Sequence, residues 1–222
     1  MKQTALLFDL DGTLVDSVPD LALAANRLLA ELGHPPLGEA AVAAMVGDGV
    51  AKLVERVLAG RGLGAVAPEP AVRRFVALYT ADATTLTRPY PGVLDGLAAL
   101  AAAGTQLAVC TNKPERATRA VLAGVGLARF FPVVLGGDSL PVRKPDPAPL
   151  RAALAQLGVA PEAAAMVGDH RNDVLAAQGA GAAAIFARYG YGGATLGELR
   201  PDAEIDSFSE LPGVMARIWS RP

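Results

Sequence analysis

The chain has one cysteine, no long apolar run and no excess of charge of either sign. A single cysteine, Cys110, excludes an internal disulfide, and the apolar stretch near the N-terminus is interrupted by Asp9. That stretch is too short for a secretory signal or a membrane span. The sequence therefore predicts a soluble, cytoplasmic protein with no membrane partner. Because Cys110 lies in an apolar segment, we expect a buried, unreactive thiol rather than a nucleophile.

The charges of the two signs nearly cancel, with 20 Lys and Arg against 22 Asp and Glu and a formal net charge of -2. Nucleic-acid-binding proteins present a basic surface, so we expect no nucleic-acid partner. A chain of 222 residues with 52% hydrophobic and 19% charged residues has the composition of a globular protein. This length suffices for one α/β domain with an insertion.

From residue 89 onward, short apolar runs alternate with helical patterns. The apolar runs predict strands at residues 106–110, 133–135, 163–167 and 182–186. The helical patterns lie at residues 93–103, 115–122, 147–157 and 174–178. This alternation indicates a parallel sheet with helices on both faces. We therefore predict an α/β fold, a doubly wound Rossmann-like core formed by residues 1–15 and 89–222.

Residues 16–88 show helical patterns only, separated by Gly and Pro. The predicted helices lie at residues 21–32, 39–45, 50–58 and 71–81. We expect this segment to be a helical domain inserted between the first strand and the rest of the sheet.

Two aspartates follow the first predicted strand, Ala5–Phe8. Parallel sheets bind ligands outside the carboxyl ends of their strands, where Asp9 and Asp11 would lie. Residues two apart in an extended segment point the same way, so both carboxylates can face one ligand. Gly12 then permits a sharp turn. Asp-Gly is also a common turn dipeptide, so this stretch alone leaves a purely structural role open.

Two further polar stretches follow predicted strands. Thr111 and Asn112 precede a helix start at Pro114, which favours an anion site, although ordinary helix capping is the alternative. Lys144 is held in a non-helical conformation by the following Pro145. Its ammonium can neutralise a phosphate oxygen, although a lysine is more often a solvated surface charge.

A third stretch contains Asp169, just past a predicted strand, and Asp173, near the start of a helix that Asn172 can cap. Asp173 alone can be a favourable charge in a first helical turn. Adjacent carboxylates at one sheet edge repel each other unless a cation lies between them. Together with Asp9 and Asp11, Asp169 therefore indicates a Mg²⁺ site that a substrate phosphate would complete.

The stretches "DLDGTLVDS", "TNK", "KPDP" and "GDHRND" together resemble the four motifs of the haloacid-dehalogenase-like (HAD) superfamily of phosphohydrolases. The helical insertion resembles the C1-type cap of that superfamily. The stretches "GGD" at 136–138 and "RYGYG" at 188–192 resemble its phosphoglycolate phosphatase branch.

The resemblance implies a role for each matching residue. Asp9 would attack phosphorus and form an aspartyl-phosphate, and Asp11 would protonate the leaving alcohol and then activate water. The phosphoryl oxygens would be held by Thr111, Asn112 and Lys144. Mg²⁺ would be bound by Asp9, the backbone carbonyl of Asp11 and Asp169, with Asp173 behind them fixing Lys144 or a metal-bound water.

The sequence departs from the family pattern at two positions. The family usually has a small residue where His170 stands, and we expect His170 to be a solvent-facing loop residue because Mg²⁺ prefers oxygen ligands. The branch tends to have an uncharged residue where Asp48 stands. An acid there does not favour an anionic substrate unless it caps the helix that begins near Val50.

The predicted substrate is a small phosphorylated metabolite, 2-phosphoglycolate. Helix N–H groups near Gly47 and Gly49 could receive its carboxylate, with Lys52 and Arg56 on one face of the same helix. Alternatively, Lys52 and Arg56 are a solvated face paired with acidic neighbours. Other readings are an N-acetylmuramate 6-phosphate or other sugar-phosphate phosphatase, a phosphomutase, or a binding module without turnover. Monomer and homodimer both remain open.

Overall fold

Six parallel strands form one sheet in the larger part of the molecule. The computed structural model describes residues 3–64 and 68–219, and in it the strand order is β5-β4-β1-β6-β7-β8. The strands are β1 (Ala5–Phe8), β4 (Gln106–Cys110), β5 (Val133–Leu135), β6 (Ala164–Gly168), β7 (Ala183–Ala187) and β8 (Ala203–Ile205). The first strand pairs with both β4 and β6, so it lies inside the sheet.

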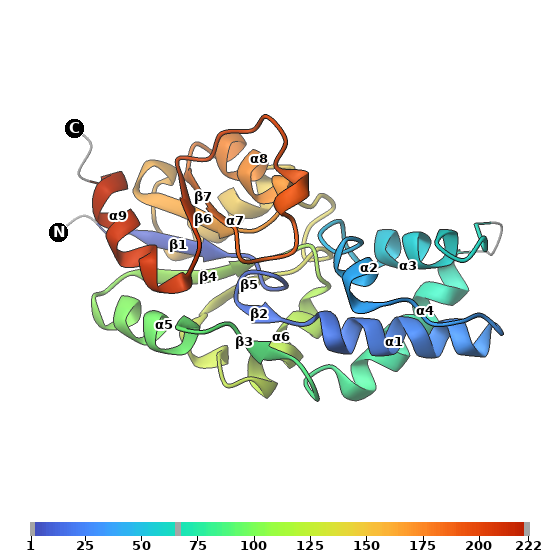
Figure 1. The fold of residues 1–222 in the computed structure, drawn as a ribbon. Coiled ribbons are helices and arrows are strands. Elements are labelled where there is room, and N and C mark those ends of the chain that lie inside the picture. The colour runs from blue at the N-terminus through green and yellow to red at the C-terminus, as the bar shows by residue number, and fades with distance from the viewer. Residues whose placement is uncertain (1–2, 65–67, 220–222) are drawn as a thin grey trace.

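Helices cover both faces of the sheet (Figure 1). They are α5 (Val93–Ala102), α6 (Glu115–Gly124), α7 (Ala148–Leu157), α8 (Arg171–Ala180) and α9 (Leu211–Trp219). Alternate residues of β1 enter different apolar clusters: Leu6 and Phe8 pack with α5, α6 and α9, whereas Ala5 and Leu7 pack with α7 and α8. This double burial explains the continuous apolar run. The predicted doubly wound α/β fold is confirmed.

Four helices lie to one side of the sheet and form what we call the helical unit (Figure 1, right). They are α1 (Val18–Glu31), α2 (Glu39–Ala43), α3 (Val50–Ala59) and α4 (Pro68–Asp82). A short antiparallel ribbon, β2 (Val15–Asp16) with β3 (Arg88–Pro89), joins the unit to the sheet. The buried carboxylate of Asp20 accepts hydrogen bonds from the backbone of Leu86 and Thr87, which fixes the returning chain.

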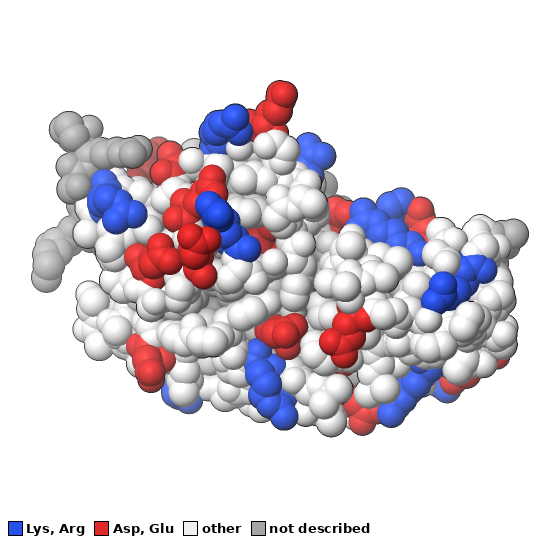
Figure 2. All heavy atoms as spheres, in the orientation of Figure 1, with Lys and Arg blue, Asp and Glu red and all other residues white. Residues whose placement is uncertain are grey.

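Lys, Arg, Asp and Glu side chains are interspersed over the face of the molecule shown in Figure 2, without a broad basic patch on that face. Among the described residues, no helix is both long enough and apolar enough to cross a membrane.

Candidate active site

Asp9 and Asp11 leave β1 at its carboxyl end, in the cavity that separates the sheet from the helical unit. Asp9 is buried, and its Oδ1 accepts a 2.8 Å hydrogen bond from the backbone of Leu10. Gly12 follows with φ of 82°, and a Cβ at Gly12 would lie 2.4 Å from Oδ2 of Asp169. Only glycine therefore lets the first loop pass so close to Asp169.

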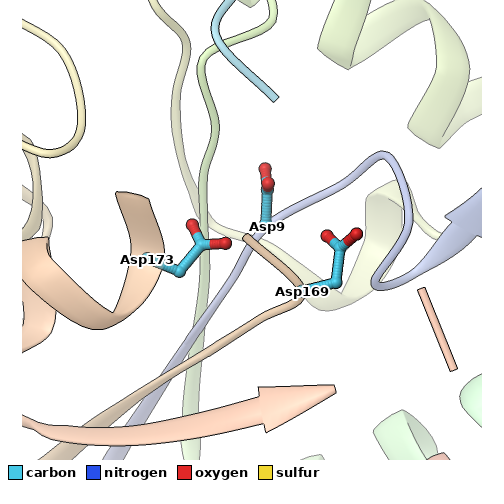
Figure 3. A group of neighbouring side chains, drawn as sticks. All are labelled: Asp9, Asp169 and Asp173. Carbon is cyan, nitrogen blue, oxygen red and sulfur yellow. The ribbon is translucent and has the colours of Figure 1, made fainter. Parts of the chain in front are cut away.

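Three carboxylates converge at this edge of the sheet. Figure 3 shows Asp9 after β1, Asp169 after β6 and Asp173 at the start of α8, and one oxygen of each lies within 4.8 Å of the others. Burial, with the charges of Asp9 and Asp173, raises the pKa of Asp169 to about 8. Burial also raises the pKa of Asp9, against the opposing effect of Lys144. The cluster is therefore short of positive charge and suited to a divalent cation.

Lys144 partly offsets the negative charge of the three carboxylates. Its Nζ lies 2.5 Å from Oδ1 of Asp173 and 3.3 Å from Oδ1 of Asp9, and it donates to the carbonyl of Cys110. Burial favours the neutral amine, but the charges of Asp173 and Asp9 outweigh it and raise the pKa of Lys144. Lys144 is thus a buried, charged lysine beside Asp9, and Asp173 holds it there.

Lys113 is a buried cation to which the sequence analysis assigned no role. Its Nζ lies 2.9 and 3.0 Å from the two carboxylate oxygens of Asp11 and 2.8 Å from the hydroxyl of Tyr79 in α4. Oδ1 of Asp11 also accepts a 2.6 Å hydrogen bond from Ser17. Asp11 is therefore oriented by groups from two segments, and Tyr79 in turn holds Lys113. The signal for Lys113 was its position in "TNK", between the end of a strand and a proline that fixes the backbone.

Thr111 and Asn112 lie beside the carboxylates, but the amide of Asn112 is already occupied. Nδ2 of Asn112 donates to the carbonyls of Gly47 and Lys144, at 3.0 and 2.9 Å. Its buried Oδ1 has no hydrogen-bond partner among the described residues. In this arrangement Asn112 connects the helical unit to the loop of Lys144, and the amide N–H groups are not free for a phosphoryl oxygen.

The expectation for His170 was wrong. His170 is buried and is the N-cap of α8, where its Nδ1 accepts a hydrogen bond from the backbone of Asn172 and Asp173 accepts one from the His170 backbone. Asn172, expected to cap this helix, instead donates a 2.8 Å hydrogen bond to Oδ1 of Asp48. His170 and Asp173 form a capping box, in which His170 takes the place of the usual Ser or Thr. This role explains why His170 is buried rather than exposed in a loop.

Gly47 and Gly49 lie at the contact between the helical unit and the sheet. A Cβ at Gly47 would lie 2.5 Å from the ring of His170, and one at Gly49 would lie 3.2 Å from the carbonyl of Asn112. Both glycines line the cavity that holds Asp9 and Asp11. The backbone at these two glycines therefore lies close to His170 and Asn112. A side chain at either position would push the helical unit away from the sheet.

Lys52 and Arg56 are not among the residues that line this cavity. Lys52 pairs with Glu55, and Arg56 pairs with Asp48 and donates to the carbonyl of Met45. The N-cap of α3 is Gly49, so Asp48 does not cap that helix with its side chain. The arrangement matches the alternative reading, in which both cations are paired with acidic neighbours.

The cavity has a volume of about 750 Å³. Asp9, Asp11, Thr111, Asn112 and Lys113 line its sheet side. Apolar residues of the helical unit line the opposite side: Leu21, Val46, Val50, Leu53, Phe75 and Val76. This volume is in the usual range for small-molecule sites.

The "RYGYG" stretch holds Asp169. The backbone N–H groups of Tyr191 and Gly192 donate to Oδ2 of Asp169 at 2.8 and 3.1 Å, and the hydroxyl of Thr13 donates to Oδ1 at 3.1 Å. The hydroxyl of Tyr191 donates to Asp16 in the ribbon. From the sequence, this stretch indicates only a resemblance to the family, whereas the structure shows that it orients Asp169.

The chain matches the family model described as haloacid dehalogenase-like hydrolase over residues 6–187. It is 48% identical over 213 residues to a phosphoglycolate phosphatase of Rhodospirillum rubrum, covering 93% of this chain and 88% of the relative. A phosphoglycolate phosphatase of Cereibacter sphaeroides is 43% identical, with coverage of 96% and 98%. A crystal structure of a predicted phosphoglycolate phosphatase from Haemophilus somnus superimposes with a TM-score of 0.89 at 34% identity, covering 96% of this chain and 98% of that one.

The fold, the carboxylate cluster and these matches define the class: the chain belongs to the haloacid dehalogenase-like hydrolase family. Within that family it falls in the branch of the phosphoglycolate phosphatases, as its motifs predicted, and it is a phosphatase.

Proposed function

We propose that this phosphatase hydrolyses 2-phosphoglycolate to glycolate and phosphate with Mg²⁺, through a phosphorylated Asp9. The observation that carries the proposal is the convergence of Asp9 and Asp11 on one cavity, backed by the buried cluster of Asp169, Asp173 and Lys144. The names of the curated relatives support the choice of substrate.

The acidic cluster fits Mg²⁺. Asp9 and Asp169 offer hard oxygen ligands, whereas Asp173 is engaged by Lys144 and by the His170 backbone. Burial and the charges of Asp9 and Asp173 raise the pKa of Asp169, and a nearby cation would favour its ionised form. We propose Asp9, the Asp11 carbonyl and Asp169 as the residues that hold the metal. When bound, Mg²⁺ offsets the negative charge of the phosphoryl group and of the carboxylates.

In the first step, an oxygen of Asp9 forms a bond to phosphorus and the bond to the leaving oxygen breaks. Asp11 donates a proton to that oxygen, so glycolate leaves as an alcohol. Lys144, beside Asp9, stabilises the charge that develops on the phosphoryl oxygens. In the second step, Asp11 takes a proton from water, which attacks phosphorus and releases phosphate from Asp9.

We propose that residues 16–88 act as a cap, which covers the substrate and excludes water during the reaction. The arrangement that supports this role is the wall of apolar side chains that the helical unit presents to Asp9 and Asp11. Residues 1–15 and 89–222 then form the catalytic core.

The test compares kcat/KM for 2-phosphoglycolate, N-acetylmuramate 6-phosphate and hexose phosphates in the presence of Mg²⁺. We expect 2-phosphoglycolate to be the best of these by at least about tenfold. The cavity of about 750 Å³ is large enough for N-acetylmuramate 6-phosphate, which is the second candidate. A higher kcat/KM for that substrate would replace the proposed one. Asp9→Asn should leave less than about a thousandth of the rate in a folded protein, because an amide is a poor nucleophile.

A further inference from the structure

Of the residues that the structure describes, two basic ones line the cavity beside Asp9 and Asp11: Lys113 and Arg116. Lys113 is not available to a ligand, because the hydrogen bonds of its ammonium go to Asp11 and Tyr79. Arg116 lies in the first turn of α6, and it has no ion pair and no side-chain hydrogen bond within the parts of the chain that the structure describes. Arg116 is therefore the cation at the cavity that is available to a ligand.

The cations of the helical unit that the sequence analysis considered for the same task are engaged elsewhere. Lys52 pairs with Glu55 and Arg56 with Asp48, and neither lines the cavity. A carboxylate that enters beside Asp9 and Asp11 needs positive charge nearby, because the two acids repel it. Arg116 supplies that charge from the sheet side of the cavity.

The backbone under Arg116 is held firmly. The N–H of the preceding Glu115 donates a 2.7 Å hydrogen bond to Asp138. A Cβ at Gly136 would lie 2.2 Å from that same backbone nitrogen, so the "GGD" loop packs tightly against the start of α6. Arg116 lies three positions after Lys113, whose ammonium contacts Asp11. The start of α6 is therefore fixed, and Arg116 lines the same cavity as the proposed acid, Asp11.

We propose that Arg116 binds the carboxylate of the leaving group, so that the enzyme selects phosphate monoesters of short hydroxy acids. This inference rests on the proposed function and assigns the carboxylate subsite within it. A guanidinium suits the task because its planar set of donors matches the two oxygens of a carboxylate.

The experiment measures kcat and KM for 2-phosphoglycolate and for ethyl phosphate, which lacks the carboxylate. Arg116→Met should lower kcat/KM for 2-phosphoglycolate by about tenfold to a hundredfold, the range expected for a charged hydrogen-bonded contact. The loss should fall mainly on KM, since the carboxylate is bound equally before and during the reaction. Ethyl phosphate should change by less than about threefold. The matched control is Arg119→Met on the same helix, whose guanidinium pairs with Glu115 outside the cavity.

Charge reversal gives a second readout. Arg116→Glu should raise kcat/KM for O-phosphoethanolamine, whose ammonium stands where the glycolate carboxylate would be, while it lowers that for 2-phosphoglycolate.

Equal losses on 2-phosphoglycolate and ethyl phosphate would overturn the inference, because Arg116 would then act on the phosphoryl group or on folding. No loss on either substrate would also overturn it and leave Arg116 a solvated arginine. A different result would contradict the proposed function itself. In that case the wild-type enzyme would show no preference for 2-phosphoglycolate over ethyl phosphate.

Discussion

At the scale of single residues, Lys113 shows how a buried charge can be stable in the core of a site. Burial opposes its ammonium, but Asp11 and the hydroxyl of Tyr79 raise the pKa of Lys113 overall. The ammonium also lies 4.5 Å from the centre of the Tyr79 ring. Because Asp11 belongs to the sheet and Tyr79 to the helical unit, this one cation binds groups from both parts of the molecule.

We expect Lys113→Met to impair turnover more for alkyl phosphates than for p-nitrophenyl phosphate. The substitution removes the group that orients Asp11, and p-nitrophenolate leaves without a proton. The measurement is kcat for both substrates, with Tyr79→Phe as the milder variant, since it removes only one of the contacts of Lys113. Equal loss on both substrates would mean that Lys113 does not act through Asp11.

Cys110 should not react with a thiol reagent in the native protein. It is buried at the end of β4, and burial raises its pKa to about 12, so the reactive thiolate is scarce at pH 8. We expect no release of thionitrobenzoate from Ellman's reagent in the native state and one equivalent after unfolding in guanidinium chloride. Stoichiometric labelling of the native protein would show that the sheet opens around β4, an inner strand between β5 and β1.

At the scale of elements, the loop between α2 and α3 brings its backbone against the sheet at Gly47, which has φ of 116°. Gly47→Ala should lower kcat/KM by at least about tenfold, because the new Cβ meets the His170 ring and displaces the helical unit from Asp9 and Asp11.

Gly33→Ala is the matched control for Gly47→Ala, since Gly33 also has a positive φ and nothing lies within 4 Å of its Cβ position. Both variants should lose stability of about 1 kcal/mol from backbone strain, and only Gly47→Ala should lose activity. Similar activity in the two variants would mean that the close approach at Gly47 does not matter for turnover.

The sequence predicted most of these elements because apolar periodicity follows burial. The strands expected at residues 106–110 and 133–135 match β4 and β5, and the four inserted helices were all expected. The ribbon of β2 and β3 was missed, because two-residue strands carry no periodic signal. The strand β8 and the helix α9 were missed as well, since no part of the motif pattern reaches them.

The sequence predicted the site residues that belong to recognisable motifs. It missed the roles that depend on which residues the fold brings together. Asp9, Asp11, Asp169 and Lys144 were found from their positions after strands. The roles of Lys113 and Arg116 depend on which partners surround each cation, and the sequence does not give those partners. The prediction that His170 is a solvent-facing loop residue was wrong, because histidine is not among the residues usually expected to cap a helix.

At the scale of the whole molecule, we expect the proposed metal site to couple Mg²⁺ binding to stability. Mg²⁺ should raise the melting temperature of the wild-type protein in a dose-dependent manner, because it binds the folded state only. Asp169→Asn should abolish this rise, whereas Asp95→Asn, at an exposed position on α5, should preserve it. Melting curves with Mg²⁺ or EDTA check this, and an unchanged rise in Asp169→Asn would place the metal elsewhere.

The inner position of β1 has a consequence for how the chain acquires its fold. Residue Ala5 pairs with Gln106 on one side and with Ala164 on the other, so the first strand made has no partner until on the order of a hundred further residues exist. During synthesis, helices α1–α4 are complete before either partner strand leaves the ribosome. A ribosome stalled before β4 would therefore carry the whole segment of α1–α4 beside an apolar strand still open to a chaperone.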